Sequence, residues 1–207
     1  MAKKEAPLNT LNDYIPKGAF PLVYEYIKKY LVHLTITKNR KSILGDYRHA
    51  HGSKNHRISI NGDLNKYSFL VTLVHELAHL VTFIEAGNRV QPHGKEWKKI
   101  YALMMKTFLG TGIFPPELDL VLKNSLHNLP ASSCADESIT RALNKYDEKR
   151  QGYIMVEDLM DGALFSMGDN KIFKKGMQLR KRIQCLELKT GKLYLFSPVY
   201  EVQQLST

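Results

Sequence analysis

The residues best suited to carry chemistry lie in one short segment, His75-Glu76-Leu77-Ala78-His79. This segment is an H-E-x-x-H motif. Residues four positions apart lie one above the other on a helix, so both imidazoles can reach one metal ion. Glu76 is rotated by about 100° from His75, so its carboxylate can reach a water molecule at the metal without being a ligand. The spacing predicts a metal site with a general base beside it.

A third metal ligand is expected downstream, because a catalytic zinc ion normally takes three protein ligands and one water. His93 supplies it, 14 positions after His79 and at the start of the next expected helix. Pro92 stiffens the approach to this residue, and Gly94 allows the backbone to pack closely near the site. We therefore expect His75, His79 and His93 to bind one Zn²⁺ ion.

The motif is expected to lie on a central helix over about Leu64–Glu85, because this segment is apolar on nearly all sides. Asp63 or Asn65 is suited to cap its start. Other helices are expected over Pro21–Val32, after Pro92, over Glu117–Lys123 and over Asp136–Tyr146. Three short strands are expected around Leu34–Thr37, over Ser42–Tyr47 and over Arg57–Ile60. Such strands in succession predict a small, mainly antiparallel sheet.

Composition excludes several protein classes. The chain has 207 residues, of which 43% are hydrophobic, so it can bury a substantial core. Its two cysteines are too few for a disulfide scaffold or a four-cysteine zinc site. No secretory signal and no membrane span are expected, which favours a cytoplasmic location. The formal net charge of +10 favours polyanionic partners such as nucleic acid.

The C-terminal part differs in composition, and we expect a domain boundary that separates residues 1–130 from residues 131–207. Strands are expected over Tyr153–Val156, Lys181–Leu188 and Lys192–Phe196, with a hairpin turn at Thr190-Gly191. The candidate nucleic-acid-binding residues are the cations Lys174, Lys175, Arg180, Lys181 and Arg182. Basic residues with aromatic residues nearby suit phosphate contact and base stacking, and the alternative is a solvated charged face.

A second basic stretch, Lys38–Arg57, contains His49, His51 and His56. We interpret these histidines as loop and strand-end residues near the substrate cleft. A second metal site is the alternative, because His49 and His51 would share one face of a strand.

The order of a helix, short strands, the H-E-L-A-H helix and the segment His93-Gly94-Lys95-Glu96-Trp97 resembles the SprT-like family of zinc metallopeptidases. The resemblance covers about residues 15–110. It implies that His75, His79 and His93 bind zinc and that Glu76 activates the attacking water. It also implies a proteolytic domain that cleaves proteins held on DNA. Many members continue into a zinc ribbon, but the region Tyr153–Val202 offers only Cys185, so a degenerate ribbon without a second zinc ion is expected.

Taken together, these patterns predict an α+β fold with a zincin-like metallopeptidase domain and a small, basic, β-rich C-terminal domain. The expected function is zinc-dependent cleavage of proteins, with DNA as a partner and no membrane. One alternative is a non-catalytic, zinc-containing DNA-binding or regulatory protein. A further alternative is a peptidase without a DNA role, whose basic tail binds an acidic protein.

Overall fold

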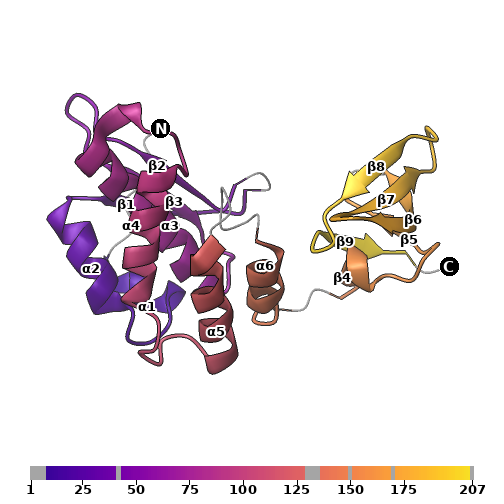
Figure 1. Cartoon of the computed structure of the whole chain (residues 1–207), viewed down its shortest axis with the longest axis horizontal. Coiled ribbons are helices and arrows are strands. Elements are labelled where there is room, and N and C mark those ends of the chain that lie inside the picture. Colours follow the sequence, from indigo (N-terminus) through magenta and orange to yellow (C-terminus); the bar gives the residue numbers. More distant parts are fainter. Residues whose placement is uncertain (1–7, 41–42, 129–135, 149–150, 169–170, 206–207) are drawn as a thin grey trace. The chain divides into compact units, whose positions relative to one another are not determined.

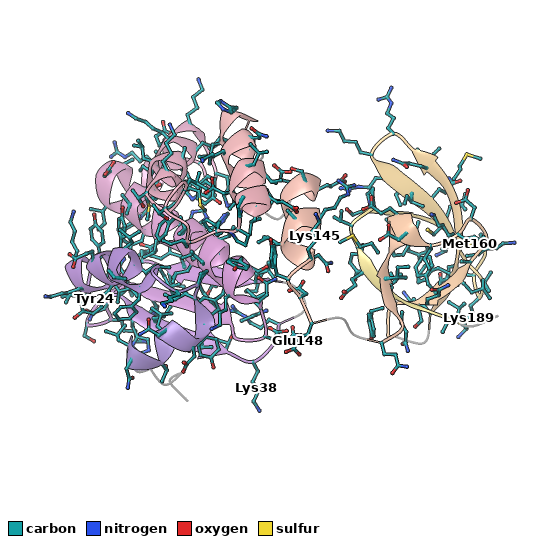
Figure 2. All side chains as sticks on the ribbon, turned by 90° about the horizontal axis from the view of Figure 1, so that it is seen from below. Tyr24, Lys38, Lys145, Glu148, Met160 and Lys189 are labelled. Atoms are coloured by element: carbon teal, nitrogen blue, oxygen red, sulfur yellow. The ribbon has the colours of Figure 1, made fainter. Side chains whose placement is uncertain are left out.

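The computed structural model describes residues 8–40, 43–128, 136–148, 151–168 and 171–205. The chain forms two compact units, Met1–Asp147 and Glu148–Thr207. The α-helices and strands of both units are labelled in Figure 1, and the side chains are drawn in Figure 2. Each unit has a hydrophobic core of its own. The fold is therefore α+β, with a separate β-rich C-terminal part.

The first unit is built from helices around a small sheet (Figure 1). Its helices are η1 (Leu8–Thr10), α1 (Leu11–Tyr14), α2 (Phe20–Lys29), α3 (Lys66–Ala86), η2 (Gly87–Arg89), α4 (Lys95–Lys106), α5 (Pro116–Ser125), η3 (Leu126–Asn128) and α6 (Glu137–Asn144). Its strands are β1 (His33–Thr37), β2 (Gly45–Arg48) and β3 (Arg57–Asn61).

Helix α3 is the centre of this unit, as its apolar sequence predicts. It packs against strands β2 and β3 and also against helix α4. Asn65 caps its start, because its side-chain Oδ1 accepts hydrogen bonds from the backbone N–H groups of Tyr67 (3.0 Å) and Ser68 (2.9 Å). The helix is long and apolar enough to cross a membrane by length and composition alone. Most of that stretch is buried inside the unit, as in the core helix of a soluble protein.

The small sheet has the strand order β1-β3-β2 among the described residues. Strand β3 pairs in parallel with β1 and antiparallel with β2. The prediction of a mainly antiparallel sheet is therefore wrong for this unit, because β3 inserts between two strands that are neighbours in the sequence. The predicted strand over Ser42–Tyr47 begins later, at Gly45, and Ser42 lies outside the described residues. Strand β2 lies at the edge of the sheet.

Helix α6 belongs to the first unit, although the expected boundary placed it in the C-terminal domain. Ile139 is buried in the core of the first unit, and Leu143 packs against that core. The side-chain amide of Asn65 donates to the carbonyl of Leu143 over 3.1 Å, so the cap of α3 also holds α6. These contacts move the division between the units to Asp147 and Glu148.

The second unit is a six-stranded sheet with the order β4-β9-β5-β6-β7-β8. Its elements are β4 (Tyr153–Met155), η5 (Val156–Asp158), β5 (Leu164–Ser166), β6 (Ile172–Leu179), β7 (Arg182–Glu187), β8 (Leu193–Phe196) and β9 (Glu201–Gln204). The predicted hairpin at Thr190-Gly191 joins β7 to β8 as an antiparallel pair. Strands β5, β6 and β9 were not predicted from the sequence. Phe165, Phe173 and Val202, one from each of them, are buried in the core.

Candidate metal centre

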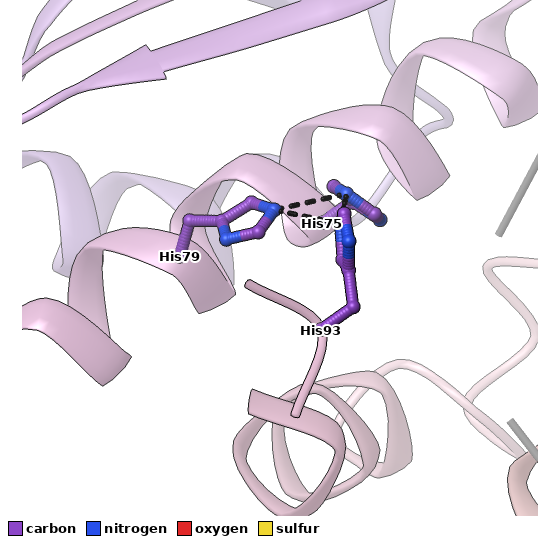
Figure 3. A group of neighbouring side chains, drawn as sticks. All are labelled: His75, His79 and His93. Atoms are coloured by element: carbon purple, nitrogen blue, oxygen red, sulfur yellow. Dashed lines mark hydrogen bonds between the residues drawn. The ribbon is translucent and has the colours of Figure 1, made fainter. Parts of the chain in front are cut away.

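Three imidazoles converge on one point in the first unit (Figure 3). The Nε2 atom of His79 lies 3.2 Å from that of His75 and 3.0 Å from that of His93, and the remaining pair is also 3.0 Å apart. Hydrogen bonds alone satisfy this triangle poorly, because each ring nitrogen offers one proton or one lone pair while facing two partners. A cation between the three nitrogens would satisfy all of them. The three histidines could therefore hold a metal ion.

The two elements that carry these side chains reach the site in different ways. His75 and His79 lie one turn apart on α3, so helix geometry alone brings their rings together. His93 lies just before α4 and has a backbone φ of 59°, in the left-handed region. That conformation costs about 1 kcal/mol or more in a non-glycine residue and marks a functional constraint. A Cβ atom at Gly94 would lie 2.9 Å from the carbonyl oxygen of Gln91, so the glycine permits this tight turn.

Trp97 forms an apolar floor beneath the three rings. It is 1% exposed, and its ring centroid lies 4.7 Å from those of His75 and His93 and 5.3 Å from that of His79. Tyr101 stacks on it at 4.9 Å. Trp97 is therefore a core residue behind the site. These contacts also fix the orientation of the ligand rings.

The same apolar surroundings keep the imidazoles uncharged. Burial is the main cause that lowers the pKa of His75 to about 3 and that of His79 to about 4, and the neighbouring histidines lower both further. Burial is the larger cause that lowers the pKa of His93, and the positive charge of Lys98 is the smaller one. Neutral imidazole is the form that binds metal ions. The site is thus ready to accept a cation at neutral pH without first releasing protons.

Glu76 lies on α3 between the two ligand turns and is 7% exposed. Strand β2 passes directly over it. A Cβ atom at Gly45 would lie 2.7 Å from the Oε1 atom of Glu76 and 2.8 Å from the Cγ2 atom of Thr72. The backbone N–H of Tyr47 donates a hydrogen bond to the Glu76 carboxylate. The edge strand therefore confines and orients this carboxylate.

The electrostatic surroundings favour a proton on Glu76. Burial, and next the charge of Asp46, raises the pKa of Glu76 to about 8, while Arg40 and the Tyr47 N–H oppose the shift. A carboxyl group that exchanges a proton near neutral pH is suited to general acid–base chemistry. A nearby cation would favour the ionised form. The arrangement thus places a carboxyl group with a pKa near neutral beside three imidazoles that could hold a metal ion.

Sequence reasoning did not find Gly45, Thr72 or the Tyr47 N–H as parts of the site. Glycine in a short strand has many explanations, and a backbone N–H has no sequence signature. Only the packing of β2 against α3 reveals their role. An unexplained glycine inside an expected strand was the one signal available, because it often marks a close backbone approach.

Of the additional histidines, His49 and His56 contact residues next to the site, and no second three-ligand cluster occurs among the described residues. His49 stacks on Phe83 of α3 at 4.9 Å. The Nδ1 atom of His56 lies 2.9 Å from the hydroxyl of Tyr47. Phe83 lies one helical turn beyond His79, so these rings extend the surface next to the metal ligands.

The candidate nucleic-acid-binding residues of the second unit do not share one environment. Arg180, Lys181 and Arg182 are exposed at the connection between β6 and β7, and Lys174 is exposed on β6. Lys175 is different, because it is only 9% exposed. Its ammonium donates to the backbone carbonyls of Glu157 (3.1 Å) and Leu159 (2.5 Å).

Because Lys175 is buried, we do not propose it as a nucleic-acid contact. Strand alternation turns this side chain into the unit, where the two carbonyls and the Asp161 carboxylate, at 3.6 Å, satisfy its charge. The sequence shows a run of cations but not which of them face solvent.

The model of the SprT-like family matches residues 10–118, which include α3, the three histidines and Glu76. A segment of 47 residues is 51% identical to "Protein SprT" of Glaesserella parasuis serovar 5 (strain SH0165). That segment is 22% of this chain and 27% of the relative, so the chain aligns with about a quarter of the relative's length. No solved structure matches the chain significantly.

Proposed function

The chain belongs to the SprT-like family, and from this membership and the geometry of the site we propose that it is a zinc-dependent endopeptidase. The observation that carries the proposal is the triangle of Nε2 atoms with the buried Glu76 beside it. The first unit would then act as a zincin-type catalytic domain. The metal ligands would be His75, His79 and His93, and the catalytic residue would be Glu76.

Zinc suits these donors better than Mg²⁺ or Ca²⁺ does. Zn–N bonds of 2.0–2.1 Å at tetrahedral angles place nitrogens about 3.3 to 3.4 Å apart. The Nε2 atoms are 3.0 to 3.2 Å apart, and small outward movements of the rings would give that spacing. Imidazole ligands suit zinc, whereas Mg²⁺ and Ca²⁺ prefer oxygen ligands. Three protein ligands leave one position for water or substrate, as in catalytic sites.

The chemistry follows from the positions of these side chains. Zinc, when bound, would polarise a peptide carbonyl as a Lewis acid and make water easier to deprotonate. Glu76 takes the proton from the attacking water and gives it to the leaving amine. The Tyr47 N–H and the close approach of Gly45 hold the carboxylate in place for both transfers. The outer edge of β2 lies beside Glu76, so a substrate chain extended along it would bring a peptide bond to the site.

Protein substrates associated with DNA are part of the proposal. The exposed cations Arg180, Lys181 and Arg182 support a nucleic-acid contact by the second unit, together with Lys174. We keep the cytoplasmic location predicted from the sequence. The alternative of a non-catalytic DNA-binding or regulatory protein is less favoured, because burying the Glu76 carboxylate is costly and a purely structural zinc site has no use for it.

The experiment compares wild type, Glu76→Gln and the control Glu85→Gln, which alters an exposed carboxylate of the same helix. Cleavage of an unfolded protein is measured with and without DNA, and zinc content is measured in parallel. We expect Glu76→Gln to retain zinc and to lose about 10²- to 10⁴-fold in cleavage rate. Glu85→Gln should behave as wild type. Equal cleavage by all three proteins would refute the proposed role of Glu76.

A further inference from the structure

The outer face of the small sheet, which points away from α3, is polar. Strand pairing sets His33 against Arg57 and Thr35 against Ser59 on β1 and β3. Arg48 of β2 also lies against Arg57, from the other side. Because side chains alternate along a strand, the residues between them point to the opposite face. Leu34, Ile58 and Ile60 are those residues, and they are buried in the core.

This outer face is hollowed. A depression of about 720 Å³ lies over β1 and the neighbouring ends of β2 and β3. Ser53, Lys54 and Asn55, from the connection between β2 and β3, line it together with residues of all three strands. The volume lies in the range of ligand pockets. None of the described residues that line the metal centre contributes to this hollow, so it is a separate feature of the unit.

Cations outnumber carboxylates in the hollow. Arg48, Lys54 and Arg57 line it, against Asp46 alone, and Asp46 pairs with Arg48 at 2.8 Å. Arg40 adds a further positive charge at the edge, where its guanidinium donates to the hydroxyl of Ser59 over 3.0 Å. The other hydrogen bonds of Arg40 among the described residues also go to neutral acceptors. The positive charge of this face is therefore not balanced by the acids that line it.

Arg57, which lines the hollow, has a buried donor without a partner in the described part of the chain. The Nε atom of Arg57 has no hydrogen-bond partner among the described atoms. Leaving such a donor unpaired is unfavourable, and the positive charge of the same guanidinium group would attract an anion in the hollow. Thr35, Ser53 and Ser59 add hydroxyl donors to the lining. Such a mixture of guanidinium, ammonium and hydroxyl groups is typical of phosphate recognition.

We propose that this hollow binds phosphate groups of a nucleic-acid backbone. The lining residues include no Phe, Tyr or Trp, so stacking of bases on such rings is not available there. Recognition would rest on the phosphates and would be independent of sequence. The site places a nucleic-acid contact on the first unit itself, in addition to the contact proposed for the second unit. It does not depend on the metal ion or on Glu76.

The test uses the full chain and a fluorescently labelled single-stranded DNA, with dissociation constants measured by anisotropy at several salt concentrations. The variants are Arg57→Gln, Lys54→Gln and Asn55→Asp. The matched control is Lys38→Gln, an exposed cation that follows the far end of β1 and projects from the ribbon in Figure 2. Circular dichroism and thermal unfolding verify that each variant is folded.

We expect each hollow variant to weaken binding roughly threefold or more, and the lysine and arginine variants to reduce the salt slope by about 0.7. The control should change affinity less than twofold. Lys54 and Asn55 are exposed, so their variants keep the test valid if Arg57→Gln does not fold. Affinities equal to the control for Lys54→Gln and Asn55→Asp would overturn the proposal. Binding of a free nucleotide is measured on the same variants. Hollow variants that lose affinity for the free nucleotide but bind DNA as wild type does would overturn the assignment to the nucleic-acid backbone.

Discussion

Gly45 and Glu76 lie so close together that a Cβ atom at Gly45 would come within 2.7 Å of the Glu76 Oε1 atom. The same atom would lie 2.9 Å from Glu76 Cγ. A glycine on the edge strand thus leaves room for the carboxylate that lies beside the candidate metal ligands. The neighbouring N–H of Tyr47 donates to that carboxylate and completes its support.

Gly45→Ala is expected to displace Glu76 while leaving the three histidines in place. The rate of peptide cleavage should fall by about 10-fold or more, because small misplacements of a catalytic group are costly. Zinc content should equal that of wild type. Steady-state cleavage and metal analysis on the same preparations measure both effects.

A second substitution provides the control for this steric explanation. Thr72 Cγ2 would lie 2.8 Å from the added methyl group, and Thr72→Ser removes that atom while retaining the hydroxyl that donates to Ser68. Gly45→Ala/Thr72→Ser should therefore recover part of the activity. A double variant no more active than Gly45→Ala alone, with both folded, would argue against crowding as the cause.

The raised pKa of Glu76 predicts a pH-dependent stability in the metal-free protein. Burial, and secondly Asp46, raises this pKa from 4.5 to about 8. Between these values the folded state binds more protons than the unfolded state, so the stability of wild type falls as pH rises. The Glu76→Gln variant has no carboxyl group to titrate at this position. Its free energy of unfolding, relative to that of wild type, should therefore rise by roughly 1–3 kcal/mol from pH 5 to pH 8.

Urea unfolding with a chelator present, at pH 5 and pH 8, measures this difference. Exposed Glu85→Gln is again the matched control and should follow wild type. If the difference between Glu76→Gln and wild type were the same at both pH values, Glu76 would not carry a raised pKa.

His93 is a proposed metal ligand and has a left-handed backbone conformation, and two substitutions separate these properties. His93→Asn and His93→Ala both remove the third imidazole, so both should lower zinc affinity by about 10-fold or more. Asn tolerates positive φ better than Ala. The metal-free Asn variant should therefore be more stable than the Ala variant by about 0.5–1 kcal/mol.

Competition with a zinc chelator gives the affinities, and chemical unfolding gives the stabilities. Equal zinc affinity for wild type and both variants would exclude His93 as a ligand. Equal stability of the two variants would show that the conformation at this position relaxes without cost.

Lys175 and Lys181 are expected to respond in opposite ways to the loss of charge. Lys175 is buried, and its Nζ atom satisfies two backbone carbonyls, so Lys175→Met should destabilise the second unit by about 1–3 kcal/mol. Lys181 is exposed, so Lys181→Met should leave stability within about 0.5 kcal/mol of wild type. Only Lys181→Met should weaken DNA binding at low salt. The reverse pattern would contradict the burial of Lys175.

The parts of the fold that the sequence predicted are those governed by local patterns. The apolar run of α3, the cap at Asn65 and the spacing of His75 and His79 each depend on neighbours in the chain. The placement of His93 needed one further assumption, that a zinc site requires a third ligand. The structure brings that residue to within 3.0 Å of the other two, measured between Nε2 atoms.

The features that escaped prediction depend on contacts between distant segments. The parallel pairing of β1 with β3 and the attachment of α6 to the first unit follow from tertiary packing, which local periodicity does not encode. The burial of Lys175 depends on carbonyls in and just after η5, 16 and 18 positions away. Gly45 is important only because α3 passes beneath it.

The most direct measurement is X-ray absorption at the zinc edge of the purified full chain, combined with metal quantification. One zinc ion per chain is expected, with three imidazole nitrogens at about 2.0 Å and no sulfur ligand. Replacing His75, His79 or His93 should remove one nitrogen from that shell or abolish retention of zinc. A chain that retains no zinc, or zinc bound through Cys185, would contradict a metal centre built on α3 and His93.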